Sequence, residues 1–189
     1  MIIEVSREIY KACLTLERYG VSSARDTELS KLIPEFRVIA VKPQGASSDE
    51  ILVLPLHDIP KRLTGAQLHA ELYRRMPNVK SILGVSPEWT TIASGIGRSL
   101  DPTTYGYVPS FDNTVPCTTK IPLSKESSGY ATVAADAICD VISGTENPRA
   151  VLIKHSGAIV FADSPRDAAE FAITLEYAAK KAFYIRKFK

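Results

Sequence analysis

Apolar residues recur every three or four positions in four segments of the chain, the spacing of an α-helix that is buried on one face. The first of these segments ends at Gly20, a natural C-terminal stop. Thr64 and Gln67 have the spacing of a capping box, and Ser164 is suited to cap a helix that begins at Pro165. The pattern predicts helices over residues 3–19, 64–76 and 130–143, and from Pro165 onward.

Shorter runs rich in β-branched residues predict strands. The last two runs flank a polar turn, so residues 150–162 are expected to form a hairpin followed by the final helix. Residues 21–34 are polar and mixed and suggest no regular element. Residues 99–129, rich in Pro, Thr, Ser and Tyr, predict long loops with short strands. The other strands are expected at 38–42, 50–54 and 81–84, with a brief helix at 89–94.

The order of these elements mixes helices with short strands and contains no internal repeat or interdomain linker. Amphipathic helices and strands of this kind bury their apolar faces against one another around one core. A chain of 189 residues is long enough for such a core. We therefore predict a single α/β domain over residues 1–189, with helices packed on a sheet.

Composition excludes several classes of partner. A net charge of +2 gives no basis for binding nucleic acid or an anionic membrane, and no apolar run approaches the length of a bilayer span. The three cysteines are widely spaced and form no C-x-x-C sequence, which argues against a zinc knuckle or a redox pair. These features predict a reduced, cytoplasmic protein.

The hairpin presents the first candidate chemistry, because a rigid turn is a common place to hold a catalytic or metal-binding group. Its bend carries His155 and Ser156. A strand reverses side-chain direction at each residue, so these two side chains point in different directions. We interpret His155 as a turn residue bonded to backbone, with metal binding as the weaker alternative.

Several sequences, in order and spacing, resemble the class II aldolase/adducin family, in particular its ribulose-phosphate 4-epimerases and fuculose-phosphate aldolases. The matching segments cover almost the whole chain: Val41-Lys42-Pro43-Gln44-Gly45, residues 72–83, Val115-Pro116-Cys117-Thr118, the hairpin, and the Ala-rich helix over residues 168–184. The resemblance implies a three-layer α/β/α sandwich with a mostly antiparallel central sheet. It also implies a homo-oligomer, expected to be a tetramer, with pockets between subunits.

The departures from this family concern its metal. Family enzymes hold a divalent ion, usually zinc, through three histidines, two from a His-x-His sequence and one from the hairpin. These positions fall on Gly84, Ser86 and Ser156, and neither glycine nor a neutral serine hydroxyl is a good zinc ligand. The resemblance therefore implies a metal-free site, with zinc as the alternative only if His155 and His69 supply ligands.

The family's carboxylate is also missing. Aldolases carry a Glu and epimerases an Asp four residues before a helical His, which is His69 here, and that position is Gly65. A general acid or base cannot be made from glycine. We expect a structural role for His69, bonding across to the sheet.

Part of the family's anion pocket is retained. Lys42 and Gly45 match its anion-contacting strand end, and Thr64 keeps a hydroxyl where Ser is usual. The family's Gly-Asn falls on Thr27-Glu28, however, and a negative charge there would repel phosphate. For Lys42 the alternative is a solvated lysine at the edge of the sheet.

The sequence therefore supports two hypotheses. The first is a non-catalytic, metal-free family member, a pseudoenzyme that acts by assembly or by binding a small phosphorylated ligand. The second is a sugar-phosphate aldolase or epimerase with a rearranged divalent-metal site.

Overall fold

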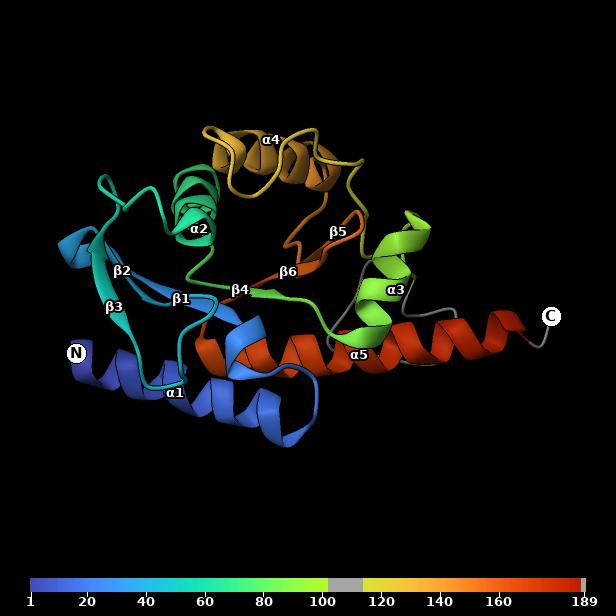
Figure 1. The fold of residues 1–189 in the computed structure, drawn as a ribbon, viewed down its shortest axis with the longest axis horizontal. Helices are drawn as coiled ribbons and strands as arrows, with labels where there is room; N and C mark the ends of the chain where they lie inside the picture. Colours follow the sequence, from blue (N-terminus) through green and yellow to red (C-terminus); the bar gives the residue numbers. More distant parts are fainter. Residues whose placement is uncertain (102–113, 188–189) are drawn as a thin grey trace.

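The computed structural model describes residues 1–101 and 114–187, and its regular elements form one antiparallel sheet with helices on both sides (Figure 1). The six strands lie in the order β3-β2-β1-β4-β6-β5, and every neighbouring pair is antiparallel. The strands are β1 (Glu28–Ile33), β2 (Val38–Lys42), β3 (Leu52–Pro55), β4 (Ser81–Val85), β5 (Ala150–Ile153) and β6 (Gly157–Ala162). The helices are α1 (Ile2–Arg18), α2 (Thr64–Arg75), α3 (Glu88–Ile96), α4 (Tyr130–Ile142) and α5 (Pro165–Lys187), with short 3-10 turns η1 (Ala24–Asp26) and η2 (Pro34–Phe36).

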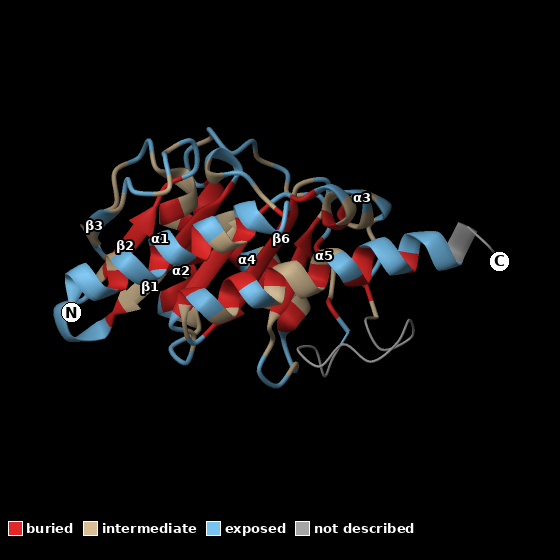
Figure 2. Cartoon of the chain, turned by 90° about the horizontal axis from the view of Figure 1, so that it is seen from below, coloured by how far each residue is buried: buried red, intermediate tan, exposed pale blue. Residues whose placement is uncertain are grey.

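The sheet separates two apolar layers. Helices α1 and α5 cover one face and α2 and α4 the other, while α3 packs against α5 at one end (Figure 1). Consecutive residues of β4 contribute to opposite layers, Ile82 to the α2–α4 side and Leu83 to the α1–α5 side. Each helix turns a buried stripe inward and an exposed stripe to solvent (Figure 2). The predicted three-layer α/β/α fold is confirmed.

The predicted helices and the hairpin are found, with ends that shift by a residue or two. Gly20 follows α1 with φ of +67°, and the Ser164 hydroxyl accepts the backbone N–H of Asp167 at 3.1 Å, so both predicted helix signals are confirmed. The predicted capping box is wrong. Helix α2 begins after Leu63 with no side-chain cap, because the Gln67 amide instead donates to the Ile59 carbonyl at 3.3 Å.

The sequence prediction missed β1, one of the two central strands, within the segment interpreted as polar and mixed. This strand pairs with β2 on one side and β4 on the other. Its polar residues do not mark a solvent face, because Glu28 and Ser30 are buried. Ser30 finds its partners in distant side chains, which a local pattern does not reveal.

The predicted loop region, residues 99–129, lies only partly within the described chain, since residues 102–113 fall outside it. The described parts form two isolated bridges, an antiparallel one between Leu100 and Val115 and a parallel one between Cys117 and Leu152. No helix in the described part of the chain is both long enough and apolar enough to span a bilayer.

Candidate functional site

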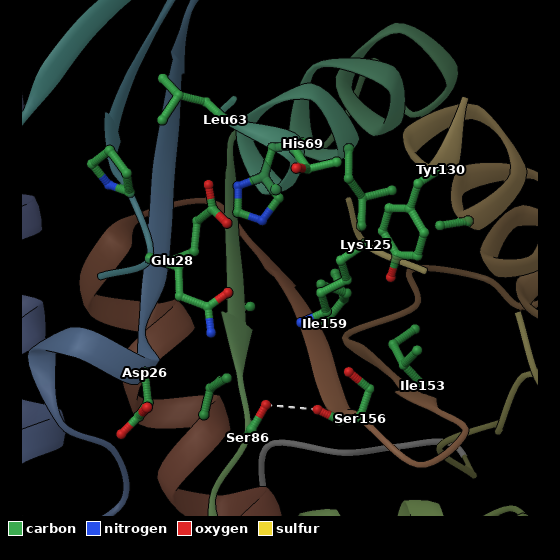
Figure 3. Close-up of a pocket in the computed structure, with 18 of the residues that line it drawn as sticks. Asp26, Glu28, Leu63, His69, Ser86, Lys125, Tyr130, Ile153, Ser156 and Ile159 are labelled. Carbon is green, nitrogen blue, oxygen red and sulfur yellow. Dashed lines mark hydrogen bonds between the residues drawn. The ribbon is translucent and has the colours of Figure 1, made fainter. Parts of the chain in front are cut away.

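A cavity of about 410 Å³ opens on the α2–α4 side of the sheet. Its walls come from η1 and the start of β1, the turn after β2, the first half of α2, the end of β4, the β5–β6 hairpin and the segment that leads into α4. Figure 3 shows side chains from these separate elements converging on it. A concave volume of this size is ordinary for a small-molecule site.

Glu28 stands at the base of this cavity, at the first position of β1 opposite Gly84 of β4. Its side chain reaches toward α2 and fills the space above Gly65: a Cβ at Gly65 would lie 1.6 Å from Glu28 Oε2. The residue is only 8% exposed. No hydrogen bond of its carboxyl to a described residue is found, and its oxygens are not among the fully buried polar atoms that lack a partner there. Burial raises the pKa of Glu28 to about 7, against the opposing effect of Lys125 and Lys42.

His69 enters the same cavity from α2, beside Glu28 (Figure 3). Its Nδ1 lies 2.9 Å from Ser30 Oγ, which is 2.9 Å from the Tyr73 hydroxyl. The predicted bond from His69 across to the sheet is therefore present. Its Nε2 points the other way, to within 3.7 Å of the position a Gly84 Cβ would take. Complete burial lowers the pKa of His69 to about 3, so the imidazole is neutral at physiological pH.

The three candidate anion-binding residues do not form one group. Thr64 and Gly45 line the cavity, but the Gly45 N–H already donates to the Arg25 carbonyl at 2.9 Å. Lys42 is not part of the cavity wall. Its ammonium donates to the carbonyls of Ala24 and, at 2.8 Å, of Thr27.

Lys42 is therefore a buried structural cation. The alternative of a solvated lysine at the edge of the sheet is wrong, because the residue is fully buried. Burial lowers the pKa of its ammonium below the ordinary lysine value.

The family's three metal positions do lie together at the cavity: Gly84 and Ser86 at the end of β4, and Ser156 in the hairpin turn. The Ser86 hydroxyl donates to the Ser156 carbonyl at 2.6 Å (Figure 3), which ties the strand end to the turn. Nearby Gly157 has φ of +109°, and a Cβ there would lie 2.4 Å from the Val85 carbonyl oxygen. The hairpin is thus held close against β4 by backbone contacts that only glycine permits.

These positions do not suit zinc. None of the three carries an imidazole, thiolate or carboxylate, the groups that bind this ion. Among the residues that the structure describes, no three His, Cys, Asp or Glu side chains come together as a metal site.

His155 does not join His69 as the alternative metal site requires. It is exposed, has φ of +64° in the hairpin turn, and its N–H donates to the Ser94 carbonyl at 3.4 Å. It is absent from the cavity wall, whereas His69 is part of it.

The sequence analysis did not identify three cationic residues of the cavity wall: Arg25, Arg62 and Lys125. All three are exposed, and no ion pair to them is found in the described part of the chain. Asp26 and Glu126 also line the wall, so the cavity carries both signs of charge. The cations come from turns far apart in the sequence, and nothing in their local sequence marks them as neighbours.

Comparison with known proteins agrees with this architecture. The class II aldolase and adducin N-terminal domain model matches residues 2–183. A probable L-ribulose-5-phosphate 4-epimerase of Mycoplasma pneumoniae is 22% identical over 97% of this chain and 83% of its own length.

Solved structures share the fold. An L-fuculose 1-phosphate aldolase superimposes with a TM-score of 0.80 at 19% identity, over 98% of this chain and 87% of its own. The L-fuculose-1-phosphate aldolase of Thermus thermophilus gives 0.74 at 20% identity, over 98% of both chains. A family match over nearly the whole sequence, with the same fold, leads to one conclusion: this chain belongs to the class II aldolase and adducin family.

Proposed function

We propose that this protein binds a small anionic molecule of the sugar-phosphate class in its cavity, without the metal ion of its relatives. The observation that carries the proposal is a retained cavity of about 410 Å³ whose wall holds Arg25, Arg62 and Lys125. Guanidinium and ammonium groups bind phosphate oxygens by charge-assisted hydrogen bonds. In this wall they lack a protein carboxylate as ion-pair partner among the described residues.

Glu28 does not prevent anion binding as strongly as the sequence suggests. With its pKa raised to about 7, this carboxyl is protonated in about half of the molecules at neutral pH. A protonated carboxyl donates a hydrogen bond to an anion instead of repelling it. Repulsion at this position is therefore expected to grow as pH rises above 7.

Metal-dependent aldolase or epimerase chemistry is the second candidate, and it needs a donor set that the cavity wall does not supply. A catalytic zinc takes about three protein ligands. Gly84, Ser86 and Ser156 provide none, and His155 lies outside the wall. We therefore propose that this protein is a pseudoenzyme that does not carry out the metal-dependent reaction of its relatives.

The expected homo-oligomer, a tetramer, remains a proposal. An apolar hollow between α3 and α5, lined by Trp89, Ile92, Ile96 and Phe183, supports it because such surfaces are often covered by another chain. Cytoplasmic location likewise stays a prediction.

Binding can be tested by calorimetry with inorganic phosphate, L-fuculose 1-phosphate and L-ribulose 5-phosphate, the last two taken from the names of the relatives. We expect one of the sugar phosphates to bind more tightly than phosphate, and Arg62→Ala to weaken it by about 10-fold or more. Lys61→Ala is the matched control, since Lys61 is exposed beside Arg62 but outside this cavity wall.

Equal affinity in the two variants, or no binding of any probe, would contradict the proposed anion site. Elemental analysis after dialysis against a chelator tests the metal separately. Zinc retained at one ion per chain would overturn the metal-free part of the proposal while leaving anion binding open to its own test.

A further inference from the structure

The cavity on the α2–α4 side has two chemically different halves. Its polar half carries charged side chains from η1, the start of β1 and the segment before α2: Arg25, Asp26, Glu28 and Arg62. Its apolar half carries side chains from α4, the hairpin and the segment before α4: Ile121, Tyr130, Ala134, Ile153 and Ile159. Figure 3 shows Asp26 and Glu28 on one side, Tyr130 and Ile153 on the other, and Lys125 between them. The anion site uses the polar half and Lys125, and it leaves the apolar half without a role.

The register of the sheet sets the distance between the two halves. Glu28 of β1 lies opposite Gly84 of β4, and Gly84 lies opposite Ile159 of β6. Residues directly opposite in antiparallel strands point to the same face, so these three form one row on the cavity floor. Two strand spacings separate the ends of this row, a distance of about 10 Å. A charged residue and an apolar one thus stand at opposite ends of a row with glycine in its middle.

Gly84 joins the two halves. A Cβ at this position would lie 3.4 Å from Ile159 Cδ1 and 3.9 Å from Glu28 Cβ, which places it between the two side chains. The family's motif carries an imidazole here, and a side chain of that size would stand between the polar and apolar halves. With glycine, the floor between them is bare, and both halves belong to one cavity of about 410 Å³.

The apolar half favours a hydrocarbon group over a chain of hydroxyls. Ile153 and Ile159 are buried at its floor, and Ala134 is fully buried under α4. Burial, aided by the nearby Glu126 charge, raises the pKa of the Tyr130 hydroxyl, so this ring stays neutral at physiological pH. A hydrocarbon group gains free energy by leaving water for such a surface, whereas hydroxyl groups would lose their hydrogen bonds to water.

We propose that the ligand of this cavity is a phosphorylated molecule whose far end is a short hydrocarbon arm. The phosphate lies in the polar half, and the arm passes over Gly84 into the apolar half between α4 and the hairpin. The row length of about 10 Å fits a phosphate ester with an arm of about four carbons. The proposal rests on the anion site described above and adds that the end remote from the phosphate is apolar.

Calorimetry with methyl phosphate and n-butyl phosphate tests the arm directly. The two probes carry the same charged group and differ only by three methylene groups. Burial of each methylene raises affinity by about 3-fold, so n-butyl phosphate should bind the full-length protein about 30-fold more tightly than methyl phosphate. The measured quantity is the ratio of the two affinities, which cancels the contribution of the phosphate.

A pair of variants assigns this ratio to the apolar half. Ile121→Ser replaces a half-buried apolar residue of the cavity wall and should lower the ratio about 5-fold. Leu123→Ser is the matched control, because Leu123 is also half-buried and packs against the same apolar layer but lies outside the cavity wall. It should leave the ratio as it is in the parent protein.

Gly84→Val tests the passage between the halves. Valine suits a strand, and its branched side chain would stand between Glu28 and Ile159. The ratio should fall toward equal affinity for the two probes. Circular dichroism shows whether each variant is folded, and if Gly84→Val is not, the comparison of Ile121→Ser with Leu123→Ser decides alone.

The outcomes separate this proposal from the one on which it rests. Equal affinity of the parent protein for methyl phosphate and n-butyl phosphate overturns the arm and leaves anion binding standing. A ratio that Ile121→Ser does not lower, or that Leu123→Ser lowers as much, also overturns it. If these probes and the sugar phosphates all fail to bind, both proposals fail.

Discussion

Lys42 and Glu28 are buried ionisable side chains on adjacent strands, and they differ in what satisfies them. The Lys42 ammonium donates to two backbone carbonyls and lies outside the cavity wall. The Glu28 carboxyl makes no hydrogen bond to a described residue that the structure shows, and it faces the cavity. A buried charge that the backbone satisfies holds the fold together, whereas a carboxyl that opens onto a cavity is available to a ligand.

The same contrast applies to the family's site positions. The imidazole positions are occupied by Gly84, Ser86 and Ser156, and no described side chain takes their place. The carboxylate position is Gly65, but there the Glu28 carboxyl occupies the vacated space. The positions that match the family's metal ligands therefore carry no imidazole, whereas a carboxyl from a different strand fills the space beside Gly65.

The largest expected effect is on stability, from removing the satisfied charge. Lys42→Met should lower the free energy of unfolding by about 3 kcal/mol, because the carbonyls of Ala24 and Thr27 lose their donor inside the protein. Urea denaturation at pH 7 measures it. Lys61→Met, at an exposed position, should change the value by less than about 0.5 kcal/mol. Equal losses in the two variants would show that Lys42 is no more structural than a surface lysine.

The second effect is a dependence of the free energy of unfolding on pH that comes from Glu28. The folded-state pKa of Glu28, about 7, is above its unfolded value near 4.5, so the folded protein binds more protons between these values. The Glu28 contribution to stability is therefore present at low pH and is lost as pH rises through 7.

His69 acts in the opposite direction, because its folded-state pKa of about 3 lies below the unfolded value of 6.5. Its contribution is present above pH 6.5 and is lost as pH falls toward 3. The two slopes oppose each other between about 4.5 and 6.5. We expect Glu28→Gln to be more stable than the parent protein at pH 8, as measured by urea denaturation across pH. A parallel pH profile for the two proteins would contradict a raised pKa at Glu28.

The sequence predicted the outer parts of this molecule better than its centre. Helices α1 and α5 are predictable from the regular spacing of one buried face. The hairpin, whose strands are buried on both faces, is predictable from two apolar runs that flank a polar turn. Strand β1 does not, because its buried polar residues are satisfied from far away: Ser30 by His69 and Tyr73, 39 and 43 residues along the chain.

The site, too, was predicted only in part, because contacts between residues far apart in the sequence leave no local pattern. Resemblance to a family placed Gly65, Gly84, Ser86 and Ser156 together, and the structure brings them to one cavity. It also favoured Lys42, whose position matches an anion-contacting residue. What the lysine contacts depends on the path of the backbone before β1, which the sequence pattern did not show. Likewise, Glu28 was identified as a repulsive charge, and only its burial above Gly65 gives it a different role.

The smallest expected effect on stability is the sharpest test of that role. Gly65→Ala places a methyl group where Glu28 Oε2 now lies. Because the obstacle is the end of a flexible side chain, the carboxyl can swing aside, and stability should change by no more than about 1 kcal/mol. The displaced carboxyl gains solvent, so the pKa of Glu28 should fall toward its ordinary value, as NMR titration of the side chain would show.

Gly84→Ala is the matched control for this effect. A methyl group there would lie 3.4 Å from Ile159 Cδ1 and 3.7 Å from His69 Nε2, which is ordinary contact. It should leave the pKa of Glu28 near 7. If Gly65→Ala leaves that pKa as high as Gly84→Ala does, the carboxyl does not depend on the missing side chain of residue 65. The space above Gly65 would then not be what positions the Glu28 carboxyl, and the contrast with Lys42 would fail.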